Sequence, residues 1–519
     1  MNIRNFIVPL TLALITTWVI QYFVINPYLS PSNAQGEHKS GQTFVAPQSK
    51  IAAQPLNKEI DFLDNEPLQD ALETSIETDH ASYIFSTHGA CLKQLTFKRV
   101  MNEKPVLLST MPSVLPAQKE TRSFLLAFEQ KTPFNYELVQ KVQQENSTRL
   151  HYKAETDQGT VEKLFTIHHA KFQVDLDLTI TPKSEPLRAR IFYTAPYMPE
   201  IKEDTIAALY TTQKGAVQKE LRTKLDLNKG WYLPGIFGSE NRYFIHALVA
   251  DGNQFAQRAY YDLRGQQDLI SILESEAITA PTTYTLSFYL GPKEEKAIQS
   301  VDVRLEQALD YSGWLAPLSK VLLLLLKYLY SFLHNYGWAI VVLTILINLI
   351  LLPLNIKSAQ SMKKYTEFQK KLVYIQQRYK DDPDTLARER TELMSKHGMT
   401  GLGGCLPKLL QLPIFFALSK VLSSSIELYK APFILWIQDL SARDPYFILP
   451  ILIGFSMILV SSSADPKQRF AMIAVALIFG TFAVNFSAGL CLYILVGIVL
   501  TGLQTLLQTS AFWSRTKWS

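Results

Sequence analysis

Residues 343–355 read LTILINLILLPLN, an apolar run interrupted by Asn348. The run lies within a longer apolar stretch, 337–354, which approaches the roughly 20 helical residues that a bilayer core requires. An uncharged amide in hydrocarbon costs free energy unless a partner or water satisfies it. The stretch therefore predicts a membrane-spanning helix, in which Asn348 needs a structural or a functional explanation.

Comparable apolar runs occupy other parts of the chain, whose 519 residues are too many for one globular domain. They cover residues 6–25, 402–422, 446–464 and 470–507. The last run is long enough for two crossings. Between them, NFSAG at 485–489 supplies the polar, glycine-containing break expected of a tight hairpin. We therefore expect six spans.

Positive charges set the expected orientation of these spans. The first span follows Arg4, which places an uncleaved N-terminus in the cytoplasm; a cleaved signal peptide is the alternative, although no A-x-A site follows closely. By alternation, residues 27–312 lie outside the cytoplasm, and residues 356–401, with ten Lys or Arg against six Asp or Glu, lie inside. The tail, which carries Arg515 and Lys517, is also cytoplasmic.

The exported segment has the composition of a water-soluble protein. Residues 27–58, rich in Pro, Ser, Gln, Ala and Gly, indicate a flexible tether. Beyond them, apolar and polar residues alternate at a period of two, which is typical of strands with one buried face. The clearest alternation occurs at 136–142, 147–155, 161–167 and 172–180. We expect a large antiparallel β-sandwich with a single core.

The cysteines of the chain provide no disulfide bond to stabilise this domain. Cys91 is alone in the exported segment, whereas Cys405 and Cys491 fall in or beside spans. No disulfide framework and no C-x-x-C metal or redox site is therefore available. The exported fold must depend on its core.

The segment 314–337 is apolar but interrupted by charge. Lys320, Lys327 and His334 recur every seven residues, which places them on one helical face opposite a leucine-rich face. This pattern favours an amphipathic helix that lies in the membrane interface, on the non-cytoplasmic side. The alternative is the start of one very long transmembrane helix.

Residues 362–398 predict a cytoplasmic helical hairpin with its turn at KDDP. An apolar stripe with the spacing three, four, three, four should hold the two helices together. Its members are Tyr365, Phe368, Leu372, Ile375 and Tyr379. The lysines of the hairpin then form a basic outer face, for which a solvated charged surface is the simplest explanation.

Motifs for catalysis are not convincing. Residues 361–364 match S-x-x-K within a lysine-rich helix, without a companion motif. His168 and His169 are adjacent on an expected strand, so they point to opposite faces and cannot both bind one metal there. Neither a P-loop nor a zinc-protease motif is present. We expect no enzyme activity, no nucleotide and no cofactor.

Polar residues recur at helical spacing within three of the expected spans. They are Thr344, Asn348 and Asn355 in the second, Lys408, Gln411, Ser419 and Ser423 in the third, and Tyr493, Thr501, Gln504 and Gln508 in the last. Hydrogen bonding between helices is one explanation. A hydrated cavity within the membrane is the other, and it accounts better for a buried lysine. In that case the candidates for its lining are Thr344, Asn348, Lys408, Gln411, Tyr493, Thr501 and Gln504.

Three segments of these spans resemble a known family. GLGGCLPKLLQLPIFFAL (401–418), APFILWIQDLSARDPYFILPIL (431–452) and FSAGLCLYI (486–494) are closely similar to the matching segments of the YidC family of membrane protein insertases. The order of anchor, exported β-domain, interfacial helix and five further spans also matches. The specific motifs lie in roughly the last 190 residues.

The resemblance implies a hydrophilic groove that is open to the cytoplasm and to lipid but closed on the periplasmic side. Such a groove receives the polar part of a nascent membrane protein. The resemblance also implies a β-super-sandwich in the periplasm, location in the inner membrane of a Gram-negative cell, and work alone or beside the Sec translocon. Contact with a ribosome is less expected, because the basic tail is reduced to WSRTKWS.

Several positions depart from the family pattern. Asn348 stands where the family usually has an arginine, FSAG replaces FPSG, and Gly497 and Ile498 replace a Ser-Asn pair. Lys408 occupies a position that is usually apolar, three residues before Gln411 and hence on the same helical face. One hypothesis is that Lys408 supplies the cation of the groove in place of the missing arginine. Snorkelling of Lys408 to cytoplasmic headgroups is the alternative.

The expected domains follow from these observations. They are an anchor (1–26), a linker (27–58), the periplasmic β-sandwich (59–312), an interfacial helix (313–335), a five-span core (336–510) that contains the hairpin (357–400), and a short tail (511–519). The expected function is insertion, folding and assembly of inner-membrane proteins. The alternatives are a paralogue that only assembles or docks membrane protein complexes and, with less support, a small-solute transporter, since no inverted repeat is visible.

Overall fold

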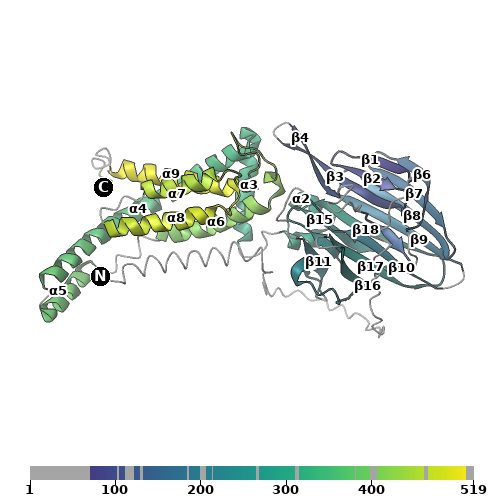
Figure 1. Ribbon diagram of the computed structural model, residues 1–519, viewed down its shortest axis with the longest axis horizontal. Helices are drawn as coiled ribbons and strands as arrows, with labels where there is room; N and C mark the ends of the chain where they lie inside the picture. The colour runs from purple at the N-terminus through teal and green to yellow at the C-terminus, as the bar shows by residue number, and fades with distance from the viewer. Residues whose placement is uncertain are drawn as a thin grey trace. The chain divides into compact units, whose positions relative to one another are not determined.

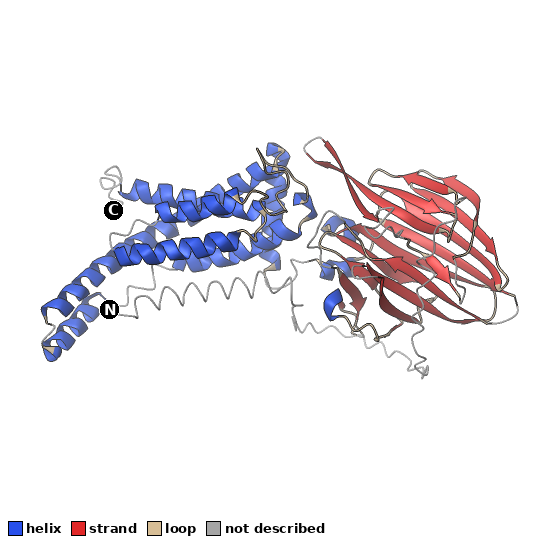
Figure 2. Cartoon of the chain, in the orientation of Figure 1, coloured by secondary structure: helices blue, strands red, loops and turns tan. Residues whose placement is uncertain are grey.

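The computed structural model describes most of the chain as two compact units. The described residues are 71–101, 104–111, 122–128, 133–183, 186–198, 206–212, 214–264, 268–309, 315–379, 382–397, 406–460 and 466–509. Those up to Leu309 form the first unit and those from Leu315 onward form the second. The first unit consists mainly of strands and the second of helices (Figures 1 and 2). The predicted anchor and linker lie outside the described residues.

The described part of the first unit, the β-unit, folds into three sheets whose neighbouring strands are antiparallel. The largest sheet has nine strands in the order β12 (Val217–Leu221), β11 (Ala207–Thr211), β14 (Phe237–Glu240), β15 (Phe244–Asp251), β18 (Thr282–Pro292), β9 (Gln173–Pro182), β8 (Gly159–His168), β7 (Ser147–Glu155) and β6 (Glu137–Gln143).

The two smaller sheets complete the β-unit. One has the order β1 (Glu73–Glu77), β2 (Ala81–Ser86), β3 (Cys91–Met101) and β4 (Lys104–Met111). The other has the order β13 (Trp231–Tyr232), β16 (Arg258–Arg264), β17 (Asp268–Ile278), β10 (Leu187–Thr194) and β5 (Leu125–Ala127). The short helices are η4 (Arg222–Lys224), α2 (Glu295–Gln299) and η5 (Val303–Ala308).

The four stretches with a period of two correspond to consecutive strands, β6 to β9, but the predicted buried face is wrong for β6, an edge strand whose residues are all exposed or half-buried. Along β8, buried residues alternate with half-buried ones at every position, and β9 shows the same alternation. The predicted antiparallel β-sandwich is therefore confirmed. Its core contains Phe165 from β8 and Phe288 from β18, whose rings both contact that of Phe124. Such aromatic pairs add stabilisation beyond their buried area.

Lys163 interrupts this core as a fully buried cation. Its position on β8 belongs to the inward face, between Val161 and Phe165. The Nζ atom donates hydrogen bonds to the carbonyl oxygens of Gly89 (2.7 Å), Ala90 (3.2 Å) and Phe124 (2.7 Å). An ammonium has three N–H donors, so these three acceptors match its protonated form.

The three acceptor residues share an uncommon backbone conformation. The φ angles of Gly89, Ala90 and Phe124 are 86°, 39° and 72°, a region that non-glycine residues rarely occupy. The aromatic ring of Tyr136 lies 4.9 Å from the Lys163 Nζ atom and also favours a positive charge. Lys163 therefore stabilises two strained turns that precede β3 and β5.

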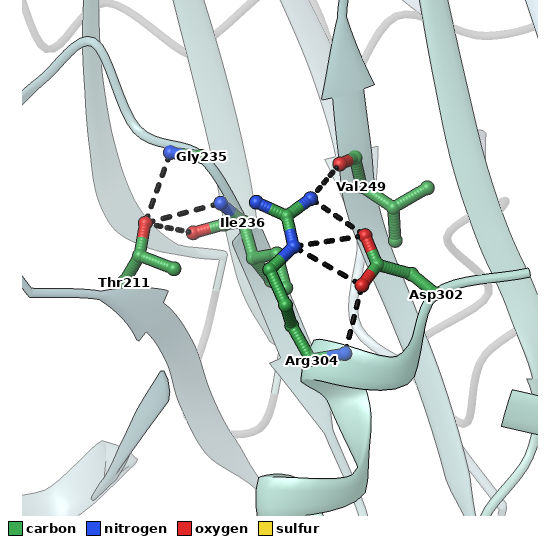
Figure 3. A network of polar contacts seen from close by, with 6 residues as sticks. All are labelled: Thr211, Gly235, Ile236, Val249, Asp302 and Arg304. Carbon is green, nitrogen blue, oxygen red and sulfur yellow. Dashed lines mark hydrogen bonds and ion pairs between the residues drawn. The ribbon is translucent and has the colours of Figure 1, made fainter. Parts of the chain in front are cut away.

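The chain leaves the β-unit through η5, which a polar network holds against the nine-stranded sheet (Figure 3). The Arg304 guanidinium donates to the Asp302 carboxylate and, at 2.7 Å, to the Val249 carbonyl oxygen on β15. Beside it, the Thr211 hydroxyl accepts from the Gly235 amide at 2.9 Å. The bond from Arg304 to Val249 therefore attaches η5 to β15.

The helical unit contains α3 (Ala316–Leu333), α4 (Tyr336–Arg378), α5 (Pro383–His397), α6 (Leu406–Ser424), η7 (Ile426–Leu428), α7 (Ile448–Val460), α8 (Pro466–Ala483) and α9 (Ala488–Thr509). Three segments of the described residues are long and apolar enough to cross a membrane: Ala316–Leu333, Tyr336–Lys357 and Ala488–Leu507. Helix α7 and residues 472–483 of α8 are apolar but shorter.

Helix α3 is separate from α4, so the alternative of one very long helix is wrong. His334 adopts a left-handed conformation with φ of 52° and ends α3. The Asn335 side chain then accepts hydrogen bonds from Gly337 N and Trp338 N and caps α4. His334 therefore does not lie on the helical face that the sequence assigned to it. The leucines of α3 are divided: Leu322, Leu323 and Leu326 are buried, whereas Leu324, Leu325 and Leu333 are exposed.

Helices α4 and α5 lie on either side of residues 380–381, where the sequence predicted the turn of a hairpin. Its first helix is continuous with the second predicted span, because α4 runs unbroken through Pro353 to Arg378. Helix α5 packs against α4. Phe368 is buried, whereas Leu372, Ile375 and Tyr379 are half-buried; the side chain of Tyr365 is not among those described.

Candidate functional site

The helices of the second unit pack around α4, α6 and α9, which contact one another. Helix α3 packs on α4 and α6, and α7 packs on α9. A turn separates α8 from α9 near residues 484–487. The predicted break between two consecutive apolar helices is therefore confirmed, and both helices pack against α7.

One end of this bundle is closed by residues 425–447, which we call the cap loop. Asn335 Nδ2 donates to Phe433 O at 3.3 Å, which ties the loop to the start of α4. The amides of Ala488 and Gly489, at the start of α9, donate to the carbonyl oxygens of residues 442 and 440 at 2.7 and 2.9 Å. The cap loop therefore joins the first turns of two candidate spans.

Close packing reinforces this junction. A Cβ atom at Gly337 would lie 2.0 Å from the Phe433 ring, so only glycine fits at that position. The Trp338 ring meets Phe433 edge to face, with 5.4 Å between centroids. The cap loop and the start of α4 thus approach each other as closely as backbone and ring allow.

Acidic side chains stabilise the cap loop from within. Asp439 Oδ1 accepts from Lys430 N, Ser441 N and Ser441 Oγ at 2.7 to 3.1 Å. Burial raises the pKa of the Asp439 carboxyl group, although these hydrogen bonds act in the opposite direction. Asp444 accepts from Trp436 Nε1 (3.1 Å) and from the backbone amides of residues 446 and 449, at the start of α7.

Glu427 of the cap loop forms an ion pair with Lys327 of α3 at 2.5 Å. The Glu427 side chain is buried and the Lys327 side chain is partly exposed. One of the two lysines predicted to mark the polar face of α3 is thus a structural contact with the bundle. Lys320 is exposed.

Burial decreases along the helices away from the cap loop. Every residue of α9 from Ala488 to Tyr493 is buried, whereas exposed residues predominate from Val499 onward. Helix α6 runs in the opposite direction: residues 411–416, remote from the cap loop, are half-buried, and residues 417–419 are buried. The bundle is tightly packed at the cap loop and looser toward the end that carries α5.

The polar residues of α4 and α9 are satisfied mainly within their own helices. Thr344 Oγ1, fully buried, donates to Ile340 O at 2.7 Å, and Asn348 Nδ2, half-buried, donates to Thr344 O at 2.8 Å. The exposed hydroxyl of Thr501 donates to Gly497 O at 2.8 Å. Such bonds to the preceding turn are common for side chains in helices. They do not support the explanation that these three residues join one helix to another.

Gln411 and Tyr493 are brought together from different helices. Tyr493 is buried, and the half-buried Gln411 side chain on α6 interacts with its hydroxyl group. The hydroxyl nevertheless has no partner at full hydrogen-bond geometry among the described residues. Its burial and incomplete pairing mark the place where α6 and α9 approach each other below the cap loop.

The other polar residues predicted from the spans contact neither Gln411 nor Tyr493 among the interactions described above. Gln504 is half-buried in the looser part of α9. Ser419 is buried, and Ser423 Oγ donates to its carbonyl oxygen at 2.6 Å. Lys408 belongs to α6, but its side chain lies outside the described part of the chain. The structure therefore does not test its predicted role as a cation.

The sequence analysis missed the cap loop as a structural unit. Its signal was present in the acidic residues at 427, 439 and 444, which lie among many apolar and aromatic residues. Buried carboxylates of this kind accept backbone amides, which helix starts leave without partners. The spacing alone did not indicate which helices they join.

Comparisons with known proteins agree with this arrangement. Residues 73–325 match the family model of the YidC periplasmic domain, and residues 328–514 match that of the 60Kd inner membrane protein. The membrane protein insertase YidC of Geobacter metallireducens is 30% identical over 503 residues, which cover 92% of each chain. That of Syntrophus aciditrophicus is 32% identical over 508 residues, 92% of this chain and 90% of the relative.

A solved structure of an active YidC insertase with its first transmembrane domain resolved covers 86% of this chain and 96% of its own. Its sequence identity is 19% and its TM-score is 0.39. The identity and coverage of the two insertases above, together with both family models, decide the assignment. This chain belongs to the YidC family of membrane protein insertases.

Proposed function

We propose that this protein inserts membrane proteins into the inner membrane and assists their folding, through a hydrophilic groove between its helices. The observation that carries the proposal is the gradient of burial. The bundle is sealed at the cap loop, and the half-buried Asn348, Gln411 and Gln504 lie where packing loosens. A client segment with polar residues would be costly to place in lipid alone. Polar partners and water within the groove would lower that cost.

The proposed topology has six spans. The anchor 1–26 and helices α6, α7 and α8 would add to the two spans of α4 and α9, while α3 would lie in the membrane interface. Both termini and the hairpin of α4 and α5 would be cytoplasmic, and the cap loop and β-unit periplasmic. The excess of Lys and Arg in residues 356–401 supports this orientation. The domain limits proposed from the sequence are retained.

The proposed lining consists of the seven residues selected from the sequence. The approach of Gln411 on α6 to Tyr493 on α9 supports the part that these two residues contribute. Thr501, Gln504 and Lys408 would extend it toward the cytoplasm. In this arrangement Asn348 is a neutral hydrogen-bonding residue, and Lys408 attracts acidic client segments.

The proposed partners are nascent inner-membrane proteins and the lipid bilayer, with the Sec translocon for some clients and with little contribution from the ribosome. We propose no nucleotide, metal or other cofactor. A second candidate function is assembly or docking of membrane protein complexes without insertion. Asn348, in place of the usual arginine, is the observation that favours it.

Complementation of a host depleted of its own insertase tests the proposal. Expression of this protein should restore growth and the insertion of a single-span client with a short translocated tail. A Tyr493→Phe variant, which removes only the hydroxyl, should restore less than a Leu506→Ala control, whose side chain is exposed. Normal membrane expression without rescue would contradict insertion. Unchanged insertion with loss of membrane protein complexes would support the second candidate.

A further inference from the structure

The cap loop presents large apolar side chains outward from a strained backbone. Leu435 is 76% exposed and has φ of 55°, and Phe447 is 46% exposed and has φ of 58°. Ile434 and Tyr446, which precede them, are 42% and 65% exposed. Left-handed backbone is unfavourable for side chains of this size. Exposure of apolar surface adds to the cost unless something outside the described chain covers it.

Hydrogen bonds hold this conformation rather than leaving it free. Phe433 N donates to Ile437 O at 2.9 Å and Ile437 N donates to Ile434 O at 3.1 Å, which closes a tight turn with Leu435 at its tip. Gln438 Nε2 donates to Leu435 O at 3.1 Å. The turn is therefore preorganised, and strain of this kind points to a function.

The depth of the tip follows from its attachment to two spans. Phe433 O is bonded to Asn335, immediately before the candidate span Tyr336–Lys357. The carbonyl of residue 440 is bonded to Gly489, at the start of the candidate span Ala488–Leu507. The cap loop thus lies level with the ends of two apolar helices. That level is the boundary between hydrocarbon and headgroups.

Charge and composition distinguish a lipid surface from a polar partner. Glu427 and Asp444 are buried within the bundle, whereas Arg443 is exposed. The outward surface is therefore apolar and aromatic with a cation beside it, which suits acyl chains below anionic phosphates. The neighbouring helix α3 also exposes apolar and aromatic side chains, namely Val321, Leu324, Tyr328 and Phe332.

We infer that the cap loop is a membrane anchor. Its side chains Leu435, Tyr446 and Phe447 insert into the adjacent lipid leaflet, at the boundary between the headgroups and the acyl chains. The inference depends on the proposed function in one respect only: the proposed topology identifies this leaflet as the periplasmic one. The strained turn keeps the apolar tip in place before lipid covers it. The anchor would hold the sealed end of the bundle at a fixed depth while the looser end accommodates a client.

Fluorescence quenching in proteoliposomes tests this inference with the full-length chain. The three native cysteines are replaced, and a single cysteine at Leu435 carries a small fluorophore in vesicles of phosphatidylethanolamine and phosphatidylglycerol. A cysteine at Lys296, an exposed position in the β-unit, is the matched control. We expect doxyl-labelled lipid to quench the Leu435 probe at least threefold more than the control, and iodide to show the opposite preference.

A Leu435 probe quenched by iodide as strongly as the control would overturn the inference. Protection of the probe from both quenchers would overturn it as well, because a second copy or another part of this chain would then cover the tip. A Leu435→Gly variant provides a second measurement that needs no probe. Since glycine tolerates positive φ, the variant should retain or increase thermal stability in detergent, and transfer into lipid vesicles should stabilise it less than it stabilises the unaltered protein.

The same samples separate this inference from the proposed function. If a client is not inserted although the Leu435 probe lies in lipid, the result counts against the groove alone. Insertion that proceeds while the probe remains in water would count against the anchor alone.

Discussion

The stability of the β-unit should increase between pH 7 and pH 9 because of Lys163. Burial lowers the pKa of the Lys163 ammonium to about 7, whereas an unfolded lysine has a pKa near 10.4. Between these values the unfolded chain binds more protons than the folded chain. The free energy of unfolding therefore rises with pH in this window and is flat below it.

The size of the effect follows from the same two pKa values. Each pH unit between them contributes at most about 1.4 kcal/mol. Because the folded group is only half titrated at pH 7, the gain from pH 7 to pH 9 is about 2 kcal/mol. The three carbonyl acceptors and the Tyr136 ring oppose this trend, since they favour the charged form.

Pulsed hydrogen exchange in urea, read from peptides that cover residues 147–182, measures this free energy in the intact protein. A Lys163→Met variant is the control, because subtracting its pH profile removes the contributions of all other titrating groups. The difference between the two proteins should change by about 2 kcal/mol from pH 7 to pH 9. A difference that stays constant over this range would refute the reasoning and show that the backbone carbonyls keep Lys163 charged.

Further predictions concern the helical unit. Gly337→Ala should lower the melting temperature in detergent by several degrees, because its Cβ would collide with the cap loop. Gly497→Ala, with open space around the new methyl group, should be neutral or stabilising by up to about 1 kcal/mol. Glu427→Gln should cost about 1 to 3 kcal/mol by breaking the ion pair with α3, whereas Glu392→Gln on exposed α5 should change little. Thermal unfolding in detergent measures each variant. Equal melting temperatures for Gly337→Ala and Gly497→Ala would contradict the first expectation, and equal values for Glu427→Gln and Glu392→Gln would contradict the second. Lys408→Leu should reduce insertion of clients with acidic tails more than of clients with neutral tails; full activity on both would exclude Lys408 as the cation of the groove.

The period of two in the exported segment was sufficient to predict the strands β6 to β9. The structure shows that Lys163 lies on the inward face of β8, where three backbone carbonyl oxygens accept its hydrogen bonds. Those acceptors come from residues 89, 90 and 124, which are distant in sequence and owe their arrangement to tertiary structure. No local pattern could have identified them.

In the helical unit, hydropathy located the apolar segments but not their neighbours. Residues 485–489 were correctly recognised as a break, but hydropathy alone did not indicate that α7 packs against both α8 and α9. The seven-residue spacing correctly placed Lys320 and Lys327 on one helix but not His334, and it did not reveal that Glu427, 100 residues away, pairs with Lys327. Helix spacing predicts which residues share a face and not what that face contacts.

Photocrosslinking from within the bundle tests the central claim most directly. A photoreactive amino acid at Gln504, which is half-buried in the looser part of α9, is compared with one at Leu506, which is 67% exposed on the same helix. During synthesis of a single-span client, the account predicts crosslinks to the polar part of the client from position 504 and few from position 506. Efficient insertion with equal crosslinking from both positions, or with none from position 504, would contradict it.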